Sequence, residues 1–302
     1  MRDDPSVEAI LGRIPVLAGP RRVEELGGGL TNRNLKVTTG SGCYVVRLSS
    51  GDASLLGIDR DAEHRDTEAA AASGAGPAVV AYRPDLGALV IEYLPGRTLG
   101  DADFADAGVL GRAAAACRTL HAGPRFTRPF DMFERQAGYL ATVRARGFAL
   151  PAAYDDHAAA WADVRRALTA TAGPTVPCNN DLLAANFVDD GSTVRLIDYE
   201  YAGNNDPCFE LGNTATECGF PPERVEAYVA AYFGEVTRER LARVRLQALC
   251  SEYGWALWGY IQAAASPLDY DFAAWGRHRF EKAAATFRGP DLAGLLRDVV
   301  GG

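Results

Sequence analysis

The chain has 302 residues, of which 48% are hydrophobic and 23% charged, so disordered, collagen-like and low-complexity classes are excluded. Its 31 lysine and arginine residues are outnumbered by 39 aspartate and glutamate residues, which gives a net charge of −8. That sign argues against a nucleic-acid partner, because neutralising a phosphate backbone requires clustered lysine and arginine. At roughly 150 residues per domain, the length predicts about two structural units.

The six cysteines show neither a Cys-x-x-Cys pair nor paired Cys/His spacing, so structural zinc and a disulfide scaffold are not expected. Residues 1–5 lack the basic and then apolar pattern that begins a signal peptide. No stretch approaches about 18 uninterrupted apolar residues, so we expect no membrane insertion. These features together predict a reducing, cytoplasmic setting.

Short apolar strands separated by glycine-rich turns dominate the first third of the chain. Strands are expected at residues 22–26, 35–38, 44–48, 78–82 and 88–94. Turns are expected at residues 27–29 and 39–42, and an acidic, then alanine-rich, segment at residues 59–73 predicts a helix. The pattern predicts a small sheet that carries one helix and ends at the linker Pro95-Gly96.

The rest of the chain has helical periodicity. Helices are expected at residues 104–121, 131–146, 152–170, 222–233, 237–265 and 271–287. A strand-rich island at about residues 176–199 interrupts them. The sequence thus predicts a small β-rich lobe, a hinge, and a larger helical lobe that holds a polar loop.

That polar loop contains the most informative residues of the chain. Asp181 is followed five residues later by Asn186, and Asp198 follows an apolar strand at 194–197. Phosphoryl transfer from a nucleotide needs an aspartate to accept the hydroxyl proton, and an asparagine and a second aspartate to hold magnesium. An isolated Asp-x4-Asn is commonly only a capped turn. The second aspartate after a buried strand, with a glycine-rich hairpin upstream, favours phosphoryl transfer.

The hairpin upstream is Gly27-Gly28-Gly29-Leu30-Thr31-Asn32. Glycines let backbone N–H groups approach phosphate oxygens, and Thr31 and Asn32 add side-chain donors. The segment is neither a Walker A motif nor a complete G-x-G-x-x-G, because Asn32 stands where the last glycine would be. Taken alone, it is equally typical of an ordinary turn.

Arg47 lies within the apolar strand at 44–48, where an unpaired charge is costly. A guanidinium suits that position if it grips phosphates and is itself paired with an acid. Glu63 on the next helix is the expected partner. The alternative is a surface charge on an edge strand.

Together these segments resemble the choline/ethanolamine kinases, within the wider aminoglycoside-phosphotransferase-like kinases, and are most similar to bacterial choline kinases. The likeness runs from about residue 25 to about residue 285. It is carried by residues 28–34, 44–47, 58–60 with Glu63, 177–186 and 197–207. The resemblance implies a bilobal, protein-kinase-like α+β fold. Residues 1–94 would form the nucleotide-binding lobe, and residues 95–302 the catalytic and acceptor-binding lobe.

The resemblance also implies ATP and Mg²⁺ as cofactors. It assigns Asp181 as the catalytic base, Asn186 and Asp198 as magnesium ligands, and Arg47 in place of the ATP-binding lysine of other kinases. Adenine would meet the backbone of residues 92–94. The implied nucleotide-binding set is Gly28, Gly29, Thr31, Asn32, Arg47, Glu63, Glu92 and Leu94.

One departure from the family lies in the catalytic loop, where Asn179 stands in place of the usual histidine. That histidine is thought to brace the loop rather than to perform chemistry. Because an asparagine still donates and accepts hydrogen bonds, we expect activity to be retained. The departure is the only support for a non-catalytic relative.

An aromatic-rich helix near residue 255 carries the acceptor hypothesis. Trp255 and Trp258 are three residues apart and share a face. An aromatic stripe at helical spacing is more often core, yet tryptophan faces beside acids also suit a quaternary ammonium, which cannot donate a hydrogen bond. The resemblance places both tryptophans in the family's cage for the trimethylammonium group, together with Tyr201, Glu217, Phe272 and Trp275.

Phe272 and Trp275 stand where the family often has tyrosines, which removes hydroxyls and favours a methylated ammonium. The sequence therefore predicts a kinase that phosphorylates the hydroxyl of choline. Three other acceptors remain open for the same chemistry, namely ethanolamine, an aminoglycoside and thiamine. A non-catalytic protein that binds choline or nucleotide is the alternative of another class.

Overall fold

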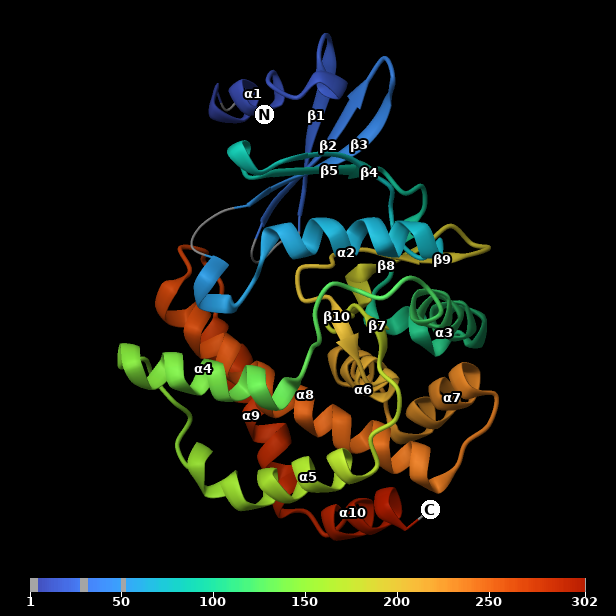
Figure 1. Cartoon of the computed structure of the whole chain (residues 1–302), viewed down its shortest axis with the longest axis vertical. Coiled ribbons are helices and arrows are strands. Elements are labelled where there is room, and N and C mark those ends of the chain that lie inside the picture. The colour runs from blue at the N-terminus through green and yellow to red at the C-terminus, as the bar shows by residue number, and fades with distance from the viewer. Residues whose placement is uncertain (1–4, 28–31, 50–52, 302) are drawn as a thin grey trace.

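A computed structural model describes residues 5–27, 32–49 and 53–301 of the chain (Figure 1). Its first part is a five-stranded antiparallel sheet with strand order β1-β2-β3-β5-β4. The strands are β1 (Arg21–Leu26), β2 (Asn32–Thr39), β3 (Gly42–Ser49), β4 (Val79–Arg83) and β5 (Ala88–Glu92). All five predicted strands are present.

Two strand ends differ from the prediction. β2 begins at Asn32 rather than at residue 35, because the polar residues before Leu35 pair with the end of β3. β5 ends at Glu92 rather than at residue 94, because Pro95 follows and cannot donate to a ladder. Both ends lie close to the residues predicted to bind nucleotide.

One face of the sheet is apolar and packs against the short helix α1 (Pro5–Leu11), which was not predicted. Leu11 and Ile14 meet Val37, Val46 and other sheet residues in a small hydrophobic cluster. The predicted helix is α2 (Arg60–Ser73), and it lies between the sheet and the helical part of the chain in Figure 1. Asp59 caps its first turn, and Gly74 ends it in the left-handed conformation.

The linker Pro95-Gly96 leads from β5 into a second, three-stranded sheet. This sheet consists of β6 (Arg97–Thr98), β8 (Phe187–Asp189) and β9 (Val194–Leu196). Gly96 has φ +128°, and a Cβ atom there would lie 2.6 Å from the carbonyl oxygen of Asp189. Only glycine fits this contact, which holds the linker against the β8–β9 turn.

The helical part packs around two buried clusters. Its helices are α3 (Ala107–His121), α4 (Met132–Arg146), α5 (Ala158–Ala170), α6 (Pro207–Glu217), α7 (Pro222–Phe233), α8 (Arg238–Ala265), α9 (Phe272–Arg288) and α10 (Leu292–Val300). Two predicted helices begin as separate 3-10 turns, at Asp101–Ala105 and Tyr154–His157. α6, α10 and the short pair formed by β7 (Val176–Cys178) and β10 (Gly203–Asn205) were not predicted in full.

Helices α8 and α9 approach closely enough to set the positions of the predicted acceptor residues. A Cβ atom on Gly259 would lie 2.7 Å from the Cα atom of Gly276, so the two helix backbones nearly touch there. The contact brings Trp258 of α8 against Trp275 of α9. Within the described residues, no helix combines the length and the apolar character needed to cross a bilayer.

Candidate active site

The predicted catalytic loop leaves β7 at Cys178 and lies beside the loop that follows β9 (Figure 1). Asn180 and Asp198 each have φ +68°, a left-handed conformation that residues other than glycine seldom adopt. Such backbone geometry is held only where its surroundings over-determine it, as at functional sites. Here the surroundings are a set of buried hydrogen bonds.

Asn179 joins the two loops. Its Nδ2 atom donates to the carbonyl oxygens of Asp198 at 2.7 Å and Ile197 at 3.1 Å, and its Oδ1 atom accepts from the backbone N–H of Asp181 at 3.1 Å. The side chain is fully buried. This asparagine therefore braces the catalytic loop through hydrogen bonds, as expected from its capacity both to donate and to accept.

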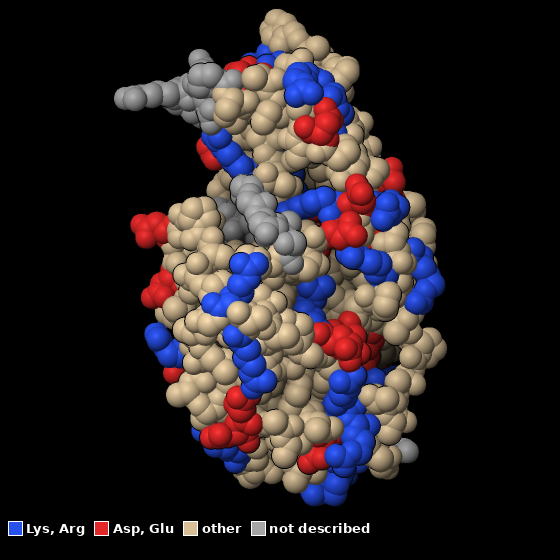
Figure 2. Space-filling view, turned by 60° about the vertical axis from the view of Figure 1, so that its left-hand side comes forward, with Lys and Arg blue, Asp and Glu red and all other residues tan. Residues whose placement is uncertain are grey.

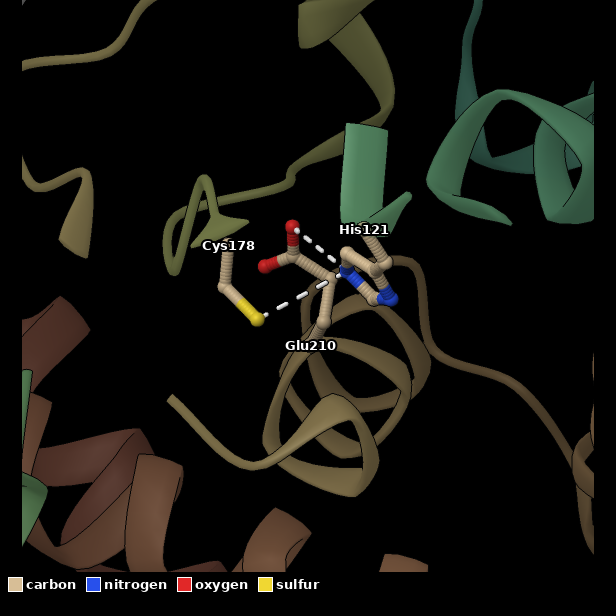
Figure 3. Close-up of side chains that lie close together, drawn as sticks. All are labelled: His121, Cys178 and Glu210. Carbon is tan, nitrogen blue, oxygen red and sulfur yellow. Dashed lines mark hydrogen bonds and ion pairs between the residues drawn. The ribbon is translucent and has the colours of Figure 1, made fainter. Parts of the chain in front are cut away.

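The buried carboxylate of Glu210, on α6, supports the same loop through hydrogen bonds. Glu210 accepts from the backbone N–H groups of Asn179 and Asn180, both at 2.7 Å. His121 lies 3.7 Å from this carboxylate and 3.6 Å from Cys178 Sγ (Figure 3). Because both carboxylate oxygens are taken by loop amides, this trio positions the loop rather than presenting a free ligand set. Sequence reasoning missed it, since its members are far apart in the chain.

The predicted magnesium ligands flank Asp181. Asn186 Nδ2 donates to the Asp181 carbonyl oxygen at 2.9 Å, which leaves the Asn186 Oδ1 atom available to a cation. Asp198 presents a carboxylate that is 29% exposed. Carboxylate and amide oxygens are the hard ligands that Mg²⁺ prefers, so this pair fits the expected metal.

Arg47 stands at the centre of a buried ionic network. Its guanidinium lies 2.8 Å from Glu63, so the ion pair expected from the sequence is present. It also lies 2.6 Å from Asp198 and 3.1 Å from Glu200. Burial lowers the pKa of Arg47, but Asp198, Glu63 and Glu200 outweigh that effect and keep the guanidinium charged.

Glu200 is a site residue to which the sequence reasoning gave no role. Its Oε2 atom accepts from Arg47 at 3.1 Å, from Arg60 at 3.0 Å and from Asn32 Nδ2 at 2.9 Å. Burial and the neighbouring Asp198 raise the pKa of Glu200 above its usual value. Glu200 therefore ties Asn32, at the end of the glycine-rich hairpin, to the loop after β9. Gly28, Gly29 and Thr31 lie outside the described residues.

The backbone predicted to contact adenine, at residues 92–94, lies at the end of β5 and just after it. The N–H groups of Glu92 and Tyr93 donate to Ala78 and Cys43 carbonyl oxygens at 2.9 and 3.1 Å, and the Glu92 side chain pairs with Arg195. In the described part of the chain, the N–H of Leu94 meets no backbone acceptor. That N–H is therefore a group that could donate a hydrogen bond to a purine base.

The predicted acceptor residues form one continuous aromatic cluster. Trp258 Nε1 donates to Tyr201 Oη at 2.8 Å. Ring centroids are 4.8 Å apart for Tyr201 and Trp255, 5.2 Å for Trp258 and Trp275, and 5.7 Å for Trp258 and Phe272. The Tyr201, Trp255, Trp258 and Phe272 side chains are buried.

Glu217 borders this cluster but is not a free carboxylate. Its side chain forms an ion pair with Arg279, whose guanidinium carbon lies 4.4 Å from the centre of the Trp275 ring. Sequence reasoning missed Arg279, because an arginine in the polar sequence of α9 has no pattern that separates it from a surface charge. The structure buries it at 7% exposure.

Asp181 interacts electrostatically with both halves of the site, that of Arg47 and that of the aromatic cluster. Burial raises its pKa well above the usual aspartate value, and the carboxylates of Glu217, Asp198 and Glu200 raise it further. Glu217 belongs to the aromatic side, whereas Asp198 and Glu200 belong to the side of Arg47. A carboxyl group of high pKa at that position can take a proton from a hydroxyl bound on one side as phosphate is transferred from the other.

Residues 22–245 match the family described as "Phosphotransferase enzyme family". The chain belongs to this family. A solved structure titled as a choline/ethanolamine kinase family protein from Mesorhizobium loti is 32% identical, covers 99% of each chain and has a TM-score of 0.87. The predicted bilobal kinase-like fold and the choline/ethanolamine kinase resemblance are thereby confirmed.

The curated relatives that are similar to this chain include both ethanolamine kinases and a choline kinase. Ethanolamine kinase 2 of Rattus norvegicus is 28% identical over 86% of this chain and 75% of its own length. Probable choline kinase 3 of Arabidopsis thaliana is 25% identical over 86% and 85%. The chain is therefore a phosphotransferase that acts on an alcohol group, and its family implies the use of ATP and a small amino alcohol.

Proposed function

We propose that the protein transfers the γ-phosphoryl group of ATP to the hydroxyl of choline. The observation that carries the proposal is that Asp181 interacts electrostatically with carboxylates of both parts of the site, Asp198 beside Arg47 and Glu217 beside the aromatic cluster. A hydroxyl held near Asp181 by an ammonium bound among the rings faces the phosphates held on the Arg47 side. Arg47, Asn32 and the Leu94 N–H are the nucleotide contacts in this proposal.

The reaction makes one bond and breaks one at phosphorus, and it moves one proton. The choline oxygen bonds to the γ-phosphorus, the bond from that phosphorus to the β–γ bridging oxygen breaks, and ADP leaves with the electron pair. The hydroxyl proton passes to the Asp181 carboxylate, whose raised pKa favours accepting it. Asn186 and Asp198 would hold Mg²⁺, which offsets negative charge on the phosphates when bound.

Choline is favoured over ethanolamine because the nearby acids already have partners. Glu217 pairs with Arg279, and Glu252 lies 3.0 Å from Lys282. A primary ammonium needs hydrogen-bond acceptors, whereas a trimethylammonium group needs only ring faces. The rings of Tyr201, Trp258 and Trp275 supply such faces. Ethanolamine is the second candidate, since several relatives are named ethanolamine kinases.

Two further features support a small-molecule acceptor and a cytoplasmic location. Basic and acidic side chains are interspersed on the face drawn in Figure 2, which suits a small acceptor better than a polyanionic polymer. The six cysteines are free, which supports a reducing, cytoplasmic setting.

The test is ADP release from Mg-ATP with a panel of acceptors. The panel holds choline, dimethylethanolamine, monomethylethanolamine, ethanolamine, thiamine and kanamycin. We expect kcat/KM to rise with each added methyl group. A profile that rises toward ethanolamine would assign the second candidate instead, and ATP binding without turnover on any acceptor would favour the non-catalytic alternative.

A further inference from the structure

A resident cation already lies on the rings assigned to the acceptor. The guanidinium carbon of Arg135, on α4, is 5.2 Å from the centre of the Tyr201 ring and 5.9 Å from that of Trp255. Two more rings complete the enclosure, Phe130 at 4.9 Å and Tyr139 at 5.8 Å. The side chain thus occupies the kind of four-ring site that binds a ligand cation.

The groups that contact the Arg135 guanidinium are aromatic rings and uncharged oxygen atoms. Its Nη1 atom donates to the Leu56 carbonyl oxygen and to Tyr139 Oη, both at 3.2 Å. No carboxylate of a described residue lies within ion-pair distance of it. Arg279 on the other side of the cluster differs in this respect, because it is neutralised by Glu217.

Arg135 is electrostatically part of the acceptor site. Burial lowers its pKa, but Tyr139, Tyr201 and the Asp181 carboxylate raise it, so it remains charged and interacts electrostatically with the proposed base. An acceptor ammonium on the same rings would meet a like charge at close range, and like charges repel more strongly in a half-buried site than in bulk water. The guanidinium and the ammonium therefore exclude each other.

We propose that Arg135 is a specificity-determining residue, whose guanidinium competes with the acceptor ammonium for the rings of Tyr201 and Trp255. Acceptor binding then requires displacement of Arg135 from the rings. The inference rests on the proposed function, in that the acceptor is taken to be a cation.

The structure offers a place for the displaced side chain. A cavity of about 440 Å³ lies beside α4, and its lining includes Arg135, Asp131 and Glu134. Asp131 is exposed and lies four residues, about one helical turn, before Arg135, whereas Glu134 already pairs with Arg165. A rotation of the arginine into this cavity would exchange ring faces for the Asp131 carboxylate and leave Tyr201 and Trp255 to the ligand.

The test measures binding of tetramethylammonium chloride by calorimetry, alongside the KM values for choline and ATP. Arg135→Met removes the charge and keeps an unbranched side chain, and Arg135→Gln is a second neutral variant. Arg135→Lys keeps the charge. The matched control is Arg224→Met, because Arg224 also lies on a ring (Phe220, 5.8 Å), and that ring packs against a different buried cluster.

We expect either neutral variant to bind tetramethylammonium about three- to tenfold more tightly, and to lower the KM for choline with the KM for ATP unchanged. Arg135→Lys and Arg224→Met should stay close to the wild type. Unchanged or weaker tetramethylammonium binding in a folded neutral variant overturns the inference, even if choline is phosphorylated. Tighter binding without turnover on choline supports the inference and overturns the choline assignment.

Discussion

Arg47 Nη2 lies 2.6 Å from Asp198 Oδ1, which joins strand β3 of the first sheet to the loop after β9 in the helical part of the chain. The same guanidinium contacts Glu63 of α2. One cation therefore fixes both the helix that underlies the sheet and the loop that carries a proposed magnesium ligand. This contact therefore positions the residues that we propose to bind the nucleotide.

Arg47→Lys is expected to weaken ATP binding and to lower stability. An ammonium is a single point of charge and cannot reach Glu63, Glu200 and Asp198 together, as the planar guanidinium does. Breaking buried ionic contacts costs about 3 kcal/mol. The KM for ATP should rise and the Tm should fall, whereas Arg13→Lys, in an exposed pair with Asp85, should change neither. An unchanged Tm would argue against a structural role for this network.

Asp181→Asn is expected to reduce turnover by about 10²–10⁴-fold, because the amide cannot accept the hydroxyl proton. The backbone contacts of the loop, including Asp181 N–H to Asn179 Oδ1, do not involve the changed group. ATP affinity, measured by calorimetry, should therefore stay near the wild-type value. Turnover that survives in this variant would remove Asp181 from the role of base.

Asn179→Ala is expected to lower kcat more than it changes the KM for ATP. The change removes the hydrogen bonds that connect the Asp198 and Ile197 carbonyl oxygens with the Asp181 N–H, all within a buried space. Because the buried carbonyl groups then lack a hydrogen-bond donor, the free energy of unfolding should fall by about 1–3 kcal/mol. Asn179→His, which restores the residue typical of the family, should retain more activity than Asn179→Ala. Equal activity in the two variants would contradict the bracing role.

Strands and long helices could be predicted because their apolar periodicity is local. The 28-residue helix α8 and the strands around Arg47 were recognised in this way, and the cation within an apolar strand correctly indicated an ion pair with Glu63. Helix α6 was missed because its buried face carries polar residues. Glu210, Asn213 and Thr214 are fully buried and hydrogen-bonded, so no apolar pattern marks the helix.

The residues of the site that escaped prediction owe their importance to distant partners. Glu200 accepts hydrogen bonds from Arg47, Arg60 and Asn32, which lie in other parts of the chain. Arg135 lies in a helix rich in polar residues and resembles a surface charge in the sequence. Only the packing of α4 against Trp255 of α8 and the neighbouring rings turns it into a half-buried cation. Contacts of this kind depend on tertiary structure and leave no local signal.

Glu217→Gln is expected to shift the acid limb of the pH profile to lower pH. Asp181 acts as a base only when ionised, and its raised pKa makes kcat/KM fall as the pH drops through a value above that of an ordinary aspartate. Removing the Glu217 charge lowers the pKa of Asp181, and the Arg279 cation that remains lowers it further. If the acid limb of the kcat/KM profile lies at the same pH in the variant as in the wild type, Glu217 does not influence the pKa of Asp181.

Trp258→Ala is expected to raise the KM for choline by about tenfold or more, with little change in the KM for ATP, because Trp258 supplies a ring face and fixes Tyr201 through its Nε1 atom. Trp258→Phe keeps an aromatic face but loses the N–H donor, so its effect should be smaller. The matched control is Trp161→Phe, since Trp161 belongs to the same core but its ring packs on Phe133 and Tyr253 rather than on Trp258. An equal rise of both KM values in Trp258→Ala would mean that the ring supports the lobe as a whole and does not contact the ammonium. A rise confined to choline, together with a milder Trp258→Phe variant, would place the quaternary ammonium on this ring.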